Sequence, residues 1–309
     1  MQAFYTDRFV LPLPAGHRFP MEKYRLLRER VAAELPGVIL TEPSPAEDVD
    51  LARAHDPAYV ARLAGGHLTK TEQQKIGFPW SEAMVARSRR SAGATLAACE
   101  AALATQSIAV NLAGGTHHAY PDRGEGFCCF NDAAVAARAM QAEGLAHRVL
   151  ILDLDVHQGN GTAVVFQHDP SVFTVSLHGE DNYPFQKETS DIDRGLPNGT
   201  GDAEYLACLE EVLEETRRQF SPDLLVYLAG ADPLASDRLG RLALTHEGLQ
   251  QRDQRVLAFA EALGLPVAVA MAGGYARPID DTVAAHFNTV RLCYEFSCGR
   301  TTRLGPEYG

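Results

Sequence analysis

From residue 108 onward, short apolar segments alternate with longer amphipathic segments, and this alternation restricts the fold more than any other feature of the sequence. The apolar segments are rich in β-branched residues and lack a polar residue at every second position, as expected of strands covered on both faces. Strands that alternate with helices predict a parallel sheet with right-handed crossovers. The predicted strands are residues 108–112, 148–154, 172–177, 223–229 and 266–272, and the predicted helices are 132–143, 161–168, 203–219, 246–263 and 279–296.

The first third of the chain is more helical. Pro20 suits the start of a helix over residues 21–35. Ser81 and Glu82 suit the N-cap and the first turn of a helix over residues 81–105. No repeat, low-complexity tract or Ser/Gly linker interrupts the sequence, so we predict a single α/β domain over residues 1–309.

The charge balance restricts the partners of the protein. The 309 residues include 28 Lys and Arg against 40 Asp and Glu, a formal charge of −12. This balance argues against nucleic acid, which requires a basic surface, and it is compatible with a cationic, lysine-bearing substrate or with solubility alone.

The six cysteines form no C-x-x-C pair, the first residues contain no apolar signal-peptide core, and no run of about 18 apolar residues occurs. We therefore predict a cytoplasmic protein without a membrane partner.

Polar residues follow the predicted strands, at the edge where ligands bind in open parallel sheets. Residues two apart on an extended strand point to the same side, so Asp155 and His157 would converge, with Asp153 behind them. Asp232 follows another strand and adds a second carboxylate. Two carboxylates, one imidazole and an open position are typical of a catalytic zinc site. Taken alone, residues 153–157 also fit a strand end with solvated acids and one hydrogen-bonded histidine.

Two further strand ends offer groups for acid–base chemistry. His117 and His118 follow a Gly-Gly pair, and a neutral imidazole beside an activated water is a natural general base. Tyr275 follows another Gly-Gly pair and is placed to donate to a developing oxyanion. Without the metal site, these would be ordinary loop histidines and an ordinary tyrosine. No G-x-G-x-x-G or Walker pattern follows a strand, so the glycine pairs do not indicate a phosphate-binding loop.

These residues lie in segments that resemble the histone deacetylase family, in its bacterial, class IV-like branch. The resemblance extends from about residue 16 to residue 294. It implies a single-domain arginase/deacetylase fold, an α/β fold with an eight-stranded, mainly parallel sheet and helices on both faces. It also implies a zinc-dependent amidohydrolase that removes acetyl or longer acyl groups from the ε-amine of lysine. The segments are HRFPMEKY (17–24), IGFPWS (76–81), GGTHHAYPDRGEGFCCFNDAAVAA (114–137), VLILDLDVHQGNGTA (149–163), VSLHG (175–179), YLAGADPLASDRLGRLALT (227–245) and MAGGY (271–275).

The resemblance assigns a role to each candidate residue and implies two kinds of metal. One zinc ion per chain and a structural potassium ion are the expected cofactors, and the expected partner is an acylated lysine in a protein or peptide, or a small acylated amine. The matching positions are the zinc ligands Asp155, His157 and Asp232, the general base and acid His118, the second histidine His117 with its buttress Asp153, and the carbonyl-polarising Tyr275. The potassium site would use Asp153, the carbonyls of Asp155 and His157, Ser176 and Leu177.

The resemblance also predicts the walls of an acyl-lysine tunnel. Gly126 and Phe127 match one wall, and Phe185 is expected to supply the opposite wall. Leu239 and Gly273 complete the predicted substrate-binding set.

Three features depart from the family pattern. Gln158 stands where many members have a second histidine. Asn160 stands where class I members have Asp, so His118 is expected to have a neutral partner. The segment 180–201, which the sequence indicates as a long loop, matches class I members poorly.

Three other functions are consistent with parts of the sequence. An arginase-like ureohydrolase needs a second metal, but Gly159 and Leu234 occupy the positions of its extra carboxylates. A non-catalytic acyl-lysine-binding module would be expected to lack Tyr275 or a zinc ligand, and all are present. An acetylpolyamine amidohydrolase would use an acidic residue at the position of Leu239 to bind a second ammonium group. An apolar residue there favours acyl-lysine over acetylpolyamine, because a buried ammonium without a partner is destabilised by several kcal/mol.

Overall fold

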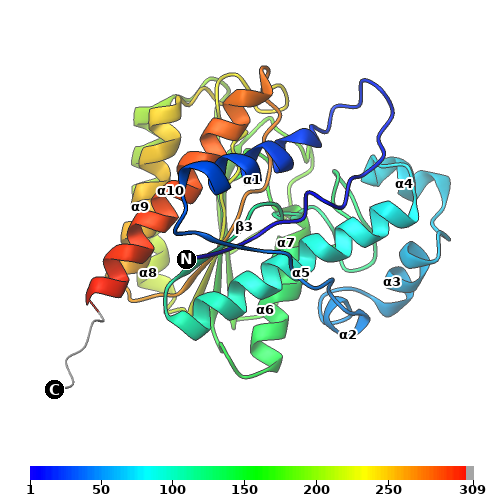
Figure 1. Ribbon diagram of the computed structural model, residues 1–309, viewed down its shortest axis with the longest axis horizontal. Helices are drawn as coiled ribbons and strands as arrows, with labels where there is room; N and C mark the ends of the chain where they lie inside the picture. The colour runs from blue at the N-terminus through cyan, green and yellow to red at the C-terminus, as the bar shows by residue number, and fades with distance from the viewer. Residues whose placement is uncertain (304–309) are drawn as a thin grey trace.

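The computed structural model describes the backbone of residues 1–303 and the side chains of residues 1–299. Within that range eight strands form one sheet in the order β2-β1-β3-β8-β7-β4-β5-β6, and every neighbouring pair is parallel. The carboxyl ends of all these strands therefore lie at the same edge of the sheet. The sheet runs through the middle of the molecule, with helices on either side (Figure 1). The strands are β1 Gln2–Phe4, β2 Ile39–Thr41, β3 Ile108–Asn111, β4 Val149–Asp153, β5 Val172–Gly179, β6 Ile192–Leu196, β7 Leu224–Leu228 and β8 Val267–Ala270.

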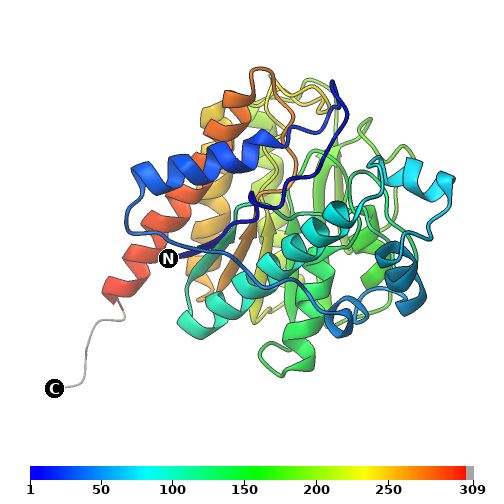
Figure 2. The same cartoon turned by 45° about the vertical axis from the view of Figure 1, so that its right-hand side comes forward.

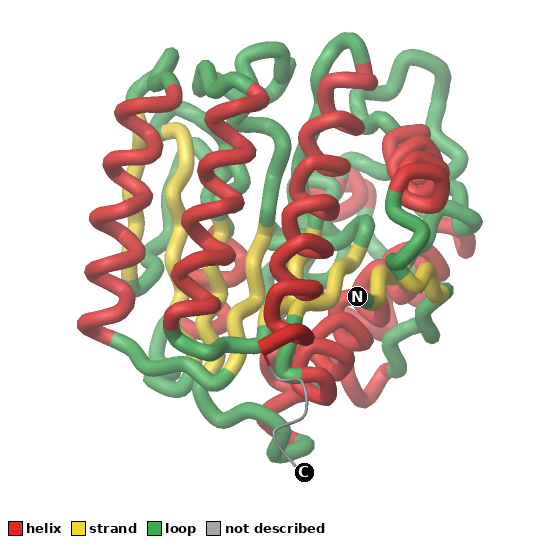
Figure 3. The backbone as a smooth tube through the Cα atoms, turned by 60° about the vertical axis from the view of Figure 1, so that its left-hand side comes forward, coloured by secondary structure: helices red, strands yellow, loops and turns green. Residues whose placement is uncertain are grey.

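Helices cover both faces of the sheet, which is the middle of three layers (Figure 2). Three long helices stand side by side in front of the strands in Figure 3, and a fourth, α1, packs against α10. The helices of this face are α1 Glu22–Glu34, α8 Asp202–Gln219, α9 His246–Ala262 and α10 Ile279–Arg303. The helices of the other side are α2 Asp48–Leu51, α3 Pro57–Ala64, α4 Lys70–Ile76, α5 Glu82–Thr105, α6 Asp132–Ala142 and α7 Asn160–Phe166.

Strand β4 shows why the strands are apolar on both faces. All five of its residues are buried. Val149 and Ile151 pack into the core beneath α5 and α6, whereas Leu150 and Leu152 pack into the core beneath α8 to α10. A strand between two helical layers needs apolar side chains at odd and even positions, because successive side chains point to opposite faces.

The structure confirms the predicted fold class and the five predicted strands, and it adds three strands that the sequence did not indicate. The sheet is parallel throughout, not only mainly parallel. Strands β1 and β2 have three residues each, which is too short for a periodic signal. Strand β6 contains Asp193, Arg194 and Gly195, which have low or moderate strand propensity, and it lies inside the segment 180–201 that was expected to be a loop.

The long predicted helices are present within one or two residues of their expected ends, apart from α10, which continues to Arg303. Ser81 caps α5 as predicted, since its side chain accepts a hydrogen bond from the backbone N–H of Met84 at 3.1 Å. Among the described helices, none is long and apolar enough to cross a bilayer. The predicted domain of residues 1–309 includes residues 304–309, which lie outside the described range.

Candidate active site

The loops after β3, β4 and β8 surround a cavity of about 530 Å³ at the carboxyl edge of the sheet. The loop after β7 places Asp232 beside this cavity, completely buried. The strand ends therefore bring together residues that are far apart in the sequence, as predicted. We call the following side chains the floor of the cavity: His117, His118, Asp155, His157, Asp232 and Tyr275.

Asp155, His157 and Asp232 meet at one point, with one possible ligand atom from each residue within 4.8 Å of the others. The Nδ1 atom of His157 lies 2.9 Å from Asp155 Oδ1 and 3.2 Å from Asp232 Oδ2. Strand β4 ends at Asp153, so Asp155 and His157 converge from the turn after the strand. The predicted trio is therefore brought together, but the expectation that an extended strand aligns the first two residues is wrong.

Backbone N–H groups hold one oxygen of each carboxylate, and both carboxylates also face the point that they share with His157. The N–H of Val156 donates to Asp232 Oδ1 at 2.9 Å, and the N–H of Gly273 donates to Asp155 Oδ2 at 2.8 Å. The Oδ2 atom of Asp232 is buried and accepts no hydrogen bond of good geometry, although His157 Nδ1 lies 3.2 Å away. A buried, unsatisfied carboxylate oxygen is unfavourable unless a cation binds it. Two carboxylates and an imidazole with one such oxygen fit a divalent metal such as zinc.

Gly273 makes room for this cluster. A Cβ atom at this position would lie 1.9 Å from Asp232 Oδ2 and 2.6 Å from Asp155 Oδ2, closer than any side chain can approach. Gly273 lines the cavity, where a substrate contact was predicted, and the close approach of both carboxylates requires glycine here.

The pKa values of the trio describe a site that favours positive charge. Burial opposes the charged form of His157, but the carboxylates of Asp155 and Asp232 raise its pKa to about 10. Burial and the neighbouring Asp155 raise the pKa of Asp232 to about 7. Burial also opposes the charge of Asp155, but His117 and His157 hold the pKa of Asp155 below its usual range. The two carboxylates therefore favour a positive charge at this point, which a bound divalent metal would supply.

The pKa values of the two adjacent histidines are shifted in opposite directions. Nδ1 of His117 donates to Asp153 Oδ2 at 2.5 Å, and although burial lowers the pKa of His117, Asp153 and Asp155 raise it to about 9. Nδ1 of His118 lies 2.6 Å from Asn160 Oδ1, the neutral partner expected from the sequence. Burial, together with His117 and His157, holds the pKa of His118 well below its ordinary value. His118 is therefore a neutral imidazole whose Nε2 can accept a proton.

A chain of hydrogen bonds continues from Asn160 away from the cavity. Nδ2 of Asn160 donates to the Tyr120 hydroxyl at 3.0 Å, and that hydroxyl donates to Glu188 Oε1 at 3.0 Å. Since Nδ2 is the donor, Oδ1 of Asn160 must accept from His118, which fixes the tautomer of that ring. Gln158 holds the backbone of Glu188 on both sides: its Nε2 donates to Glu188 O at 2.8 Å, and its Oε1 accepts from Glu188 N at 2.9 Å. Sequence reasoning did not identify Tyr120 or the role of Gln158.

Tyr275 completes the floor. Burial, together with Asp155 and Asp232, raises the pKa of Tyr275 well above its usual value, so the hydroxyl stays protonated and remains a donor. Its backbone is fixed because its N–H donates to Asp237 Oδ2 at 2.6 Å and its carbonyl accepts from Arg238 Nε at 3.0 Å. The ring lies 6.4 Å from that of His157, between centroids.

Aromatic rings form the walls above the floor. Phe127 and Gly126 both have positive φ angles, 67° and 53°, and a Cβ at Gly126 would lie 2.6 Å from His118 Cδ2. Phe185 lines the outer part of the cavity but is 82% exposed. Tyr183 instead packs against His118, with ring centroids 4.9 Å apart. Tyr183 could not be identified from the sequence, because the loop that carries it has no recognisable motif.

Leu239 lines the cavity and packs against the core, as its predicted role requires. The nearby Asp237 does not offer a carboxylate to a substrate. Its Oδ1 accepts from the N–H groups of Leu239 and Gly240 at 2.8 and 2.9 Å, and its Oδ2 accepts from Tyr275. Glu188 is also engaged, with Tyr120, and does not line the cavity. Neither Asp237 nor Glu188 is therefore a free acid beside Leu239. The exposed carboxylate that lines the cavity is Asp181, next to Asn182, whose Nδ2 donates to the Leu239 carbonyl at 2.7 Å.

The fold and the floor define an α/β protein of the arginase/deacetylase type with a candidate metal site at the carboxyl edge of its sheet. The sequence profile of the histone deacetylase domain matches residues 17–290. The chain therefore belongs to the histone deacetylase family, which places it among the deacetylase and amidohydrolase class of hydrolases.

Individual relatives and structures agree with this assignment. An uncharacterized protein of Picosynechococcus sp. is 47% identical over 286 residues, which cover 91% of this chain and 94% of that protein. The histone deacetylase-like amidohydrolase of Pseudomonas aeruginosa is 33% identical over 288 residues, 85% of this chain and 74% of the relative. The structure of a histone deacetylase homologue from Aquifex aeolicus has a TM-score of 0.81 at 26% identity, covering 96% of this chain and 83% of the other. The acetylpolyamine aminohydrolase of Burkholderia pseudomallei has a TM-score of 0.74 at 25% identity, covering 94% and 98%.

Proposed function

We propose that this protein is a zinc-dependent lysine deacylase, which removes acetyl or longer acyl groups from the ε-amine of lysine in a protein or peptide. The observation that carries the proposal is the buried cluster of Asp155, His157 and Asp232, whose possible ligand atoms lie within 4.8 Å of one another and in which Asp232 Oδ2 accepts no hydrogen bond of good geometry. These three residues would hold the zinc ion, which when bound acts as a Lewis acid toward the acyl carbonyl and the attacking water.

His118 is the general base and then the general acid. Its Nδ1–H is directed to Asn160, so Nε2 is the atom that accepts the proton of the attacking water. The low pKa of His118 keeps Nε2 unprotonated near neutral pH, because burial and the neighbouring His117 and His157 oppose a positive charge there. The protonated ring then gives the proton to the departing lysine nitrogen, which leaves as a neutral amine.

His117 and Tyr275 stabilise the negative charge that develops on the acyl oxygen. Burial opposes a charge on His117, but Asp153 and Asp155 raise its pKa and favour the positively charged form. The Tyr275 hydroxyl stays protonated and donates to the oxyanion. The lysine stem would lie between Gly126, Phe127 and Leu239, with Phe185 at the outer end, which excludes water from the floor.

Two further parts of the proposal concern a structural ion and the compartment. We propose a structural potassium ion bound by Asp153, the carbonyls of Asp155 and His157, Ser176 and Leu177. The pairing of Asp153 with Ser176 in the register of β4 and β5 supports this arrangement, because it brings the two strand ends side by side. We also propose a cytoplasmic location, which the cysteine pattern of the sequence favours.

The competing substrate is an acetylpolyamine, since a neighbour of the same fold is named as an acetylpolyamine aminohydrolase. The test is a comparison of kcat/KM for an acetyl-lysine peptide, a long-chain acyl-lysine peptide, N-acetylspermidine and N-acetylputrescine. We expect one of the lysine peptides to be hydrolysed with a kcat/KM well above both polyamines. A protein that prefers a polyamine would contradict the assignment to lysine while leaving amide hydrolysis intact.

A further inference from the structure

The entrance of the cavity is rich in exposed positive charge. Among the residues that line it, the exposed charged ones are four cations and a single carboxylate, Asp181. We call this set the mouth of the cavity: Arg18, Lys75, Asp181, Arg238 and Arg241. Arg18 precedes α1, Lys75 lies in α4, and Arg238 and Arg241 lie in the loop between β7 and α9, so the cations approach the entrance from separate parts of the chain.

Most of this charge is not neutralised within the protein. Among the described residues, no carboxylate lies within ion-pair distance of the guanidinium groups of Arg18, Arg238 or Arg241. Lys75 is 3.8 Å from Glu125, but Glu125 is already bound by Arg123 at 3.0 Å and by the Tyr183 hydroxyl at 2.9 Å.

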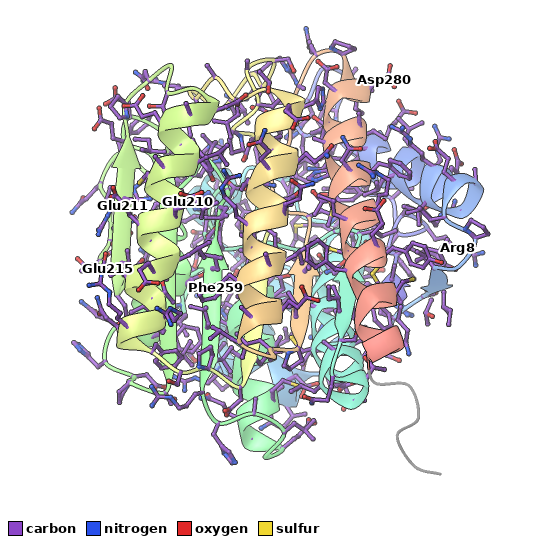
Figure 4. The ribbon with its side chains drawn as sticks, turned by 90° about the vertical axis from the view of Figure 1, so that its left-hand side faces the viewer. Arg8, Glu210, Glu211, Glu215, Phe259 and Asp280 are labelled. Atoms are coloured by element: carbon purple, nitrogen blue, oxygen red, sulfur yellow. The ribbon has the colours of Figure 1, made fainter. Side chains whose placement is uncertain are left out.

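The sign of the mouth is opposite to that of the whole protein. The chain carries 40 acidic against 28 basic residues. The acids lie elsewhere, for example on α8, where Glu210, Glu211 and Glu215 project from the outer helical face (Figure 4). A positive patch around the entrance of an acidic protein attracts anionic groups to this point and repels cationic ones.

We propose that the mouth selects acyl-lysine substrates in which aspartate or glutamate residues flank the modified lysine. This inference rests on the proposed function, because it places the acyl-lysine side chain in the cavity and the flanking residues at its entrance. Unpaired arginines suit this task, since a guanidinium group binds a carboxylate through two parallel hydrogen bonds. The same charge disfavours polyamines, whose second ammonium group would meet Arg18, Lys75 and Arg241.

The test uses three labelled acetyl-lysine peptides that differ only in flanking residues: two Asp, two Ser or two Arg. We expect kcat/KM for the Asp peptide to exceed that for the Arg peptide about tenfold or more at low ionic strength, with the ratio shrinking as salt screens the charges. The double variant Arg18→Glu, Arg241→Glu should reverse the order. Arg8→Glu is the matched control, because Arg8 is exposed, lies outside the cavity lining and should leave the ratio unchanged.

Peptide affinity, measured by fluorescence anisotropy, separates this inference from the proposed function. Equal Kd values for the Asp and Arg peptides would overturn the role of the mouth, even if both peptides were hydrolysed. A retained difference in Kd without hydrolysis of any peptide would support the mouth and contradict the deacylase assignment. A salt-independent ratio would also overturn the proposal, since it would exclude an electrostatic cause.

A second observation, the hydrogen-bond chain behind His118, carries an independent inference. The chain runs from His118 through Asn160 and Tyr120 to Glu188, with distances of 2.6, 3.0 and 3.0 Å. Burial and the hydrogen bond to Glu188 raise the pKa of Tyr120 to about 12, so its hydroxyl remains a donor. Each hydrogen bond of the chain therefore donates in the same direction, from His118 toward Glu188, and the last acceptor is a carboxylate.

We infer that Glu188 is a positioning residue for His118. By accepting from Tyr120, it orients the hydroxyl so that Asn160 Nδ2 can donate to it, and this holds Asn160 Oδ1 toward His118 Nδ1. The chain thus keeps Nε2 of His118 as the free acceptor in the cavity. Gln158 fixes the backbone of Glu188, so a change of the Glu188 side chain leaves this segment in place.

The test is a double-mutant cycle with Glu188→Ala and Tyr120→Phe. Each variant should lower kcat about tenfold with little change in KM. The double variant should lower kcat no further than either single variant, because each substitution interrupts the same hydrogen-bond chain. Glu188→Gln keeps an acceptor oxygen and should restore kcat. Additive losses, failure of Glu188→Gln to restore kcat, or wild-type kcat in Glu188→Ala would each overturn the inference.

Discussion

The floor of the cavity comes from residues directly after β3, β4, β7 and β8, whereas its mouth comes from a segment before α1, from α4 and from long loops. The floor is buried, with Asp232 completely inaccessible and His118 4% exposed. Its side chains are held by backbone amides and by one another. At the mouth, Phe185 is 82% exposed and three arginines have no ion-pair partner among the described residues.

This difference separates the parts of the site that determine chemistry from those that determine substrate choice. A parallel sheet brings its strand ends to one edge whatever the loops do, so the floor is positioned by the core. The mouth is positioned only by loops, which vary without disturbing the sheet. Changes at the floor should therefore affect turnover with every substrate, and changes at the mouth should affect the ratio between substrates.

The largest effect is expected from the metal ligands. Asp232→Asn keeps the acceptor for Val156 N–H but replaces a carboxylate oxygen by an amide, so zinc should no longer bind and hydrolysis of all substrates should be lost. Bound zinc is measured by mass spectrometry of the metal, and hydroxamate affinity should fall with it. Asp280→Asn, an exposed change on α10, is the control (Figure 4). Full activity in verified metal-free protein would contradict this assignment.

Tyr275→Phe should have the next largest effect, and it should act on turnover alone. Loss of one oxyanion donor lowers kcat by about 10²–10³-fold in comparable enzymes. Zinc content and hydroxamate affinity should be close to wild type, because no metal ligand changes. Tyr5→Phe, away from the cavity, is the matched control. Wild-type turnover in Tyr275→Phe would show that the hydroxyl has no role in the chemistry.

The floor could be predicted from the sequence because its residues sit at fixed distances from apolar strands. Asp155, His157 and Asp232 follow such strands directly, and the turn after β4 preserved their convergence although the strand ended earlier than expected. Tyr183 and Glu188 could not be predicted, because their contacts depend on the path of the segment 180–201. The sequence indicated that segment as a loop, yet it contains β6, which pairs with β5 and buries only Ile192 and Leu196 of its five residues.

Gly273→Ala tests how tightly the floor is packed. The added Cβ would lie 1.9 Å from Asp232 Oδ2, so the loop after β8 or the carboxylate must move. We expect the free energy of unfolding to fall by about 1–3 kcal/mol, the usual effect of overpacking, with weaker zinc binding and a tenfold or greater loss of kcat/KM. Gly201→Ala is the control, since nothing lies within 4 Å of a Cβ there. Equal stability and zinc affinity for both variants would contradict the close packing.

The smallest effect is expected at Leu239, on the border between floor and mouth. Leu239 lines the cavity, and the neighbouring Asp237 is occupied by three backbone N–H groups, so Asp237 does not offer a free acid to a second ammonium group here. Leu239→Glu adds that acid. We expect kcat/KM for N-acetylspermidine to rise about fivefold relative to acetyl-lysine peptide, since a close ion pair is worth on the order of 1 kcal/mol in a partly hydrated site. Leu239→Gln, with the same shape but no charge, should not change the ratio. If this kcat/KM ratio changed equally in both variants, side-chain shape and not charge would set the preference at this position. If the ratio were unchanged in Leu239→Glu, discrimination against polyamines would depend wholly on the arginines of the mouth.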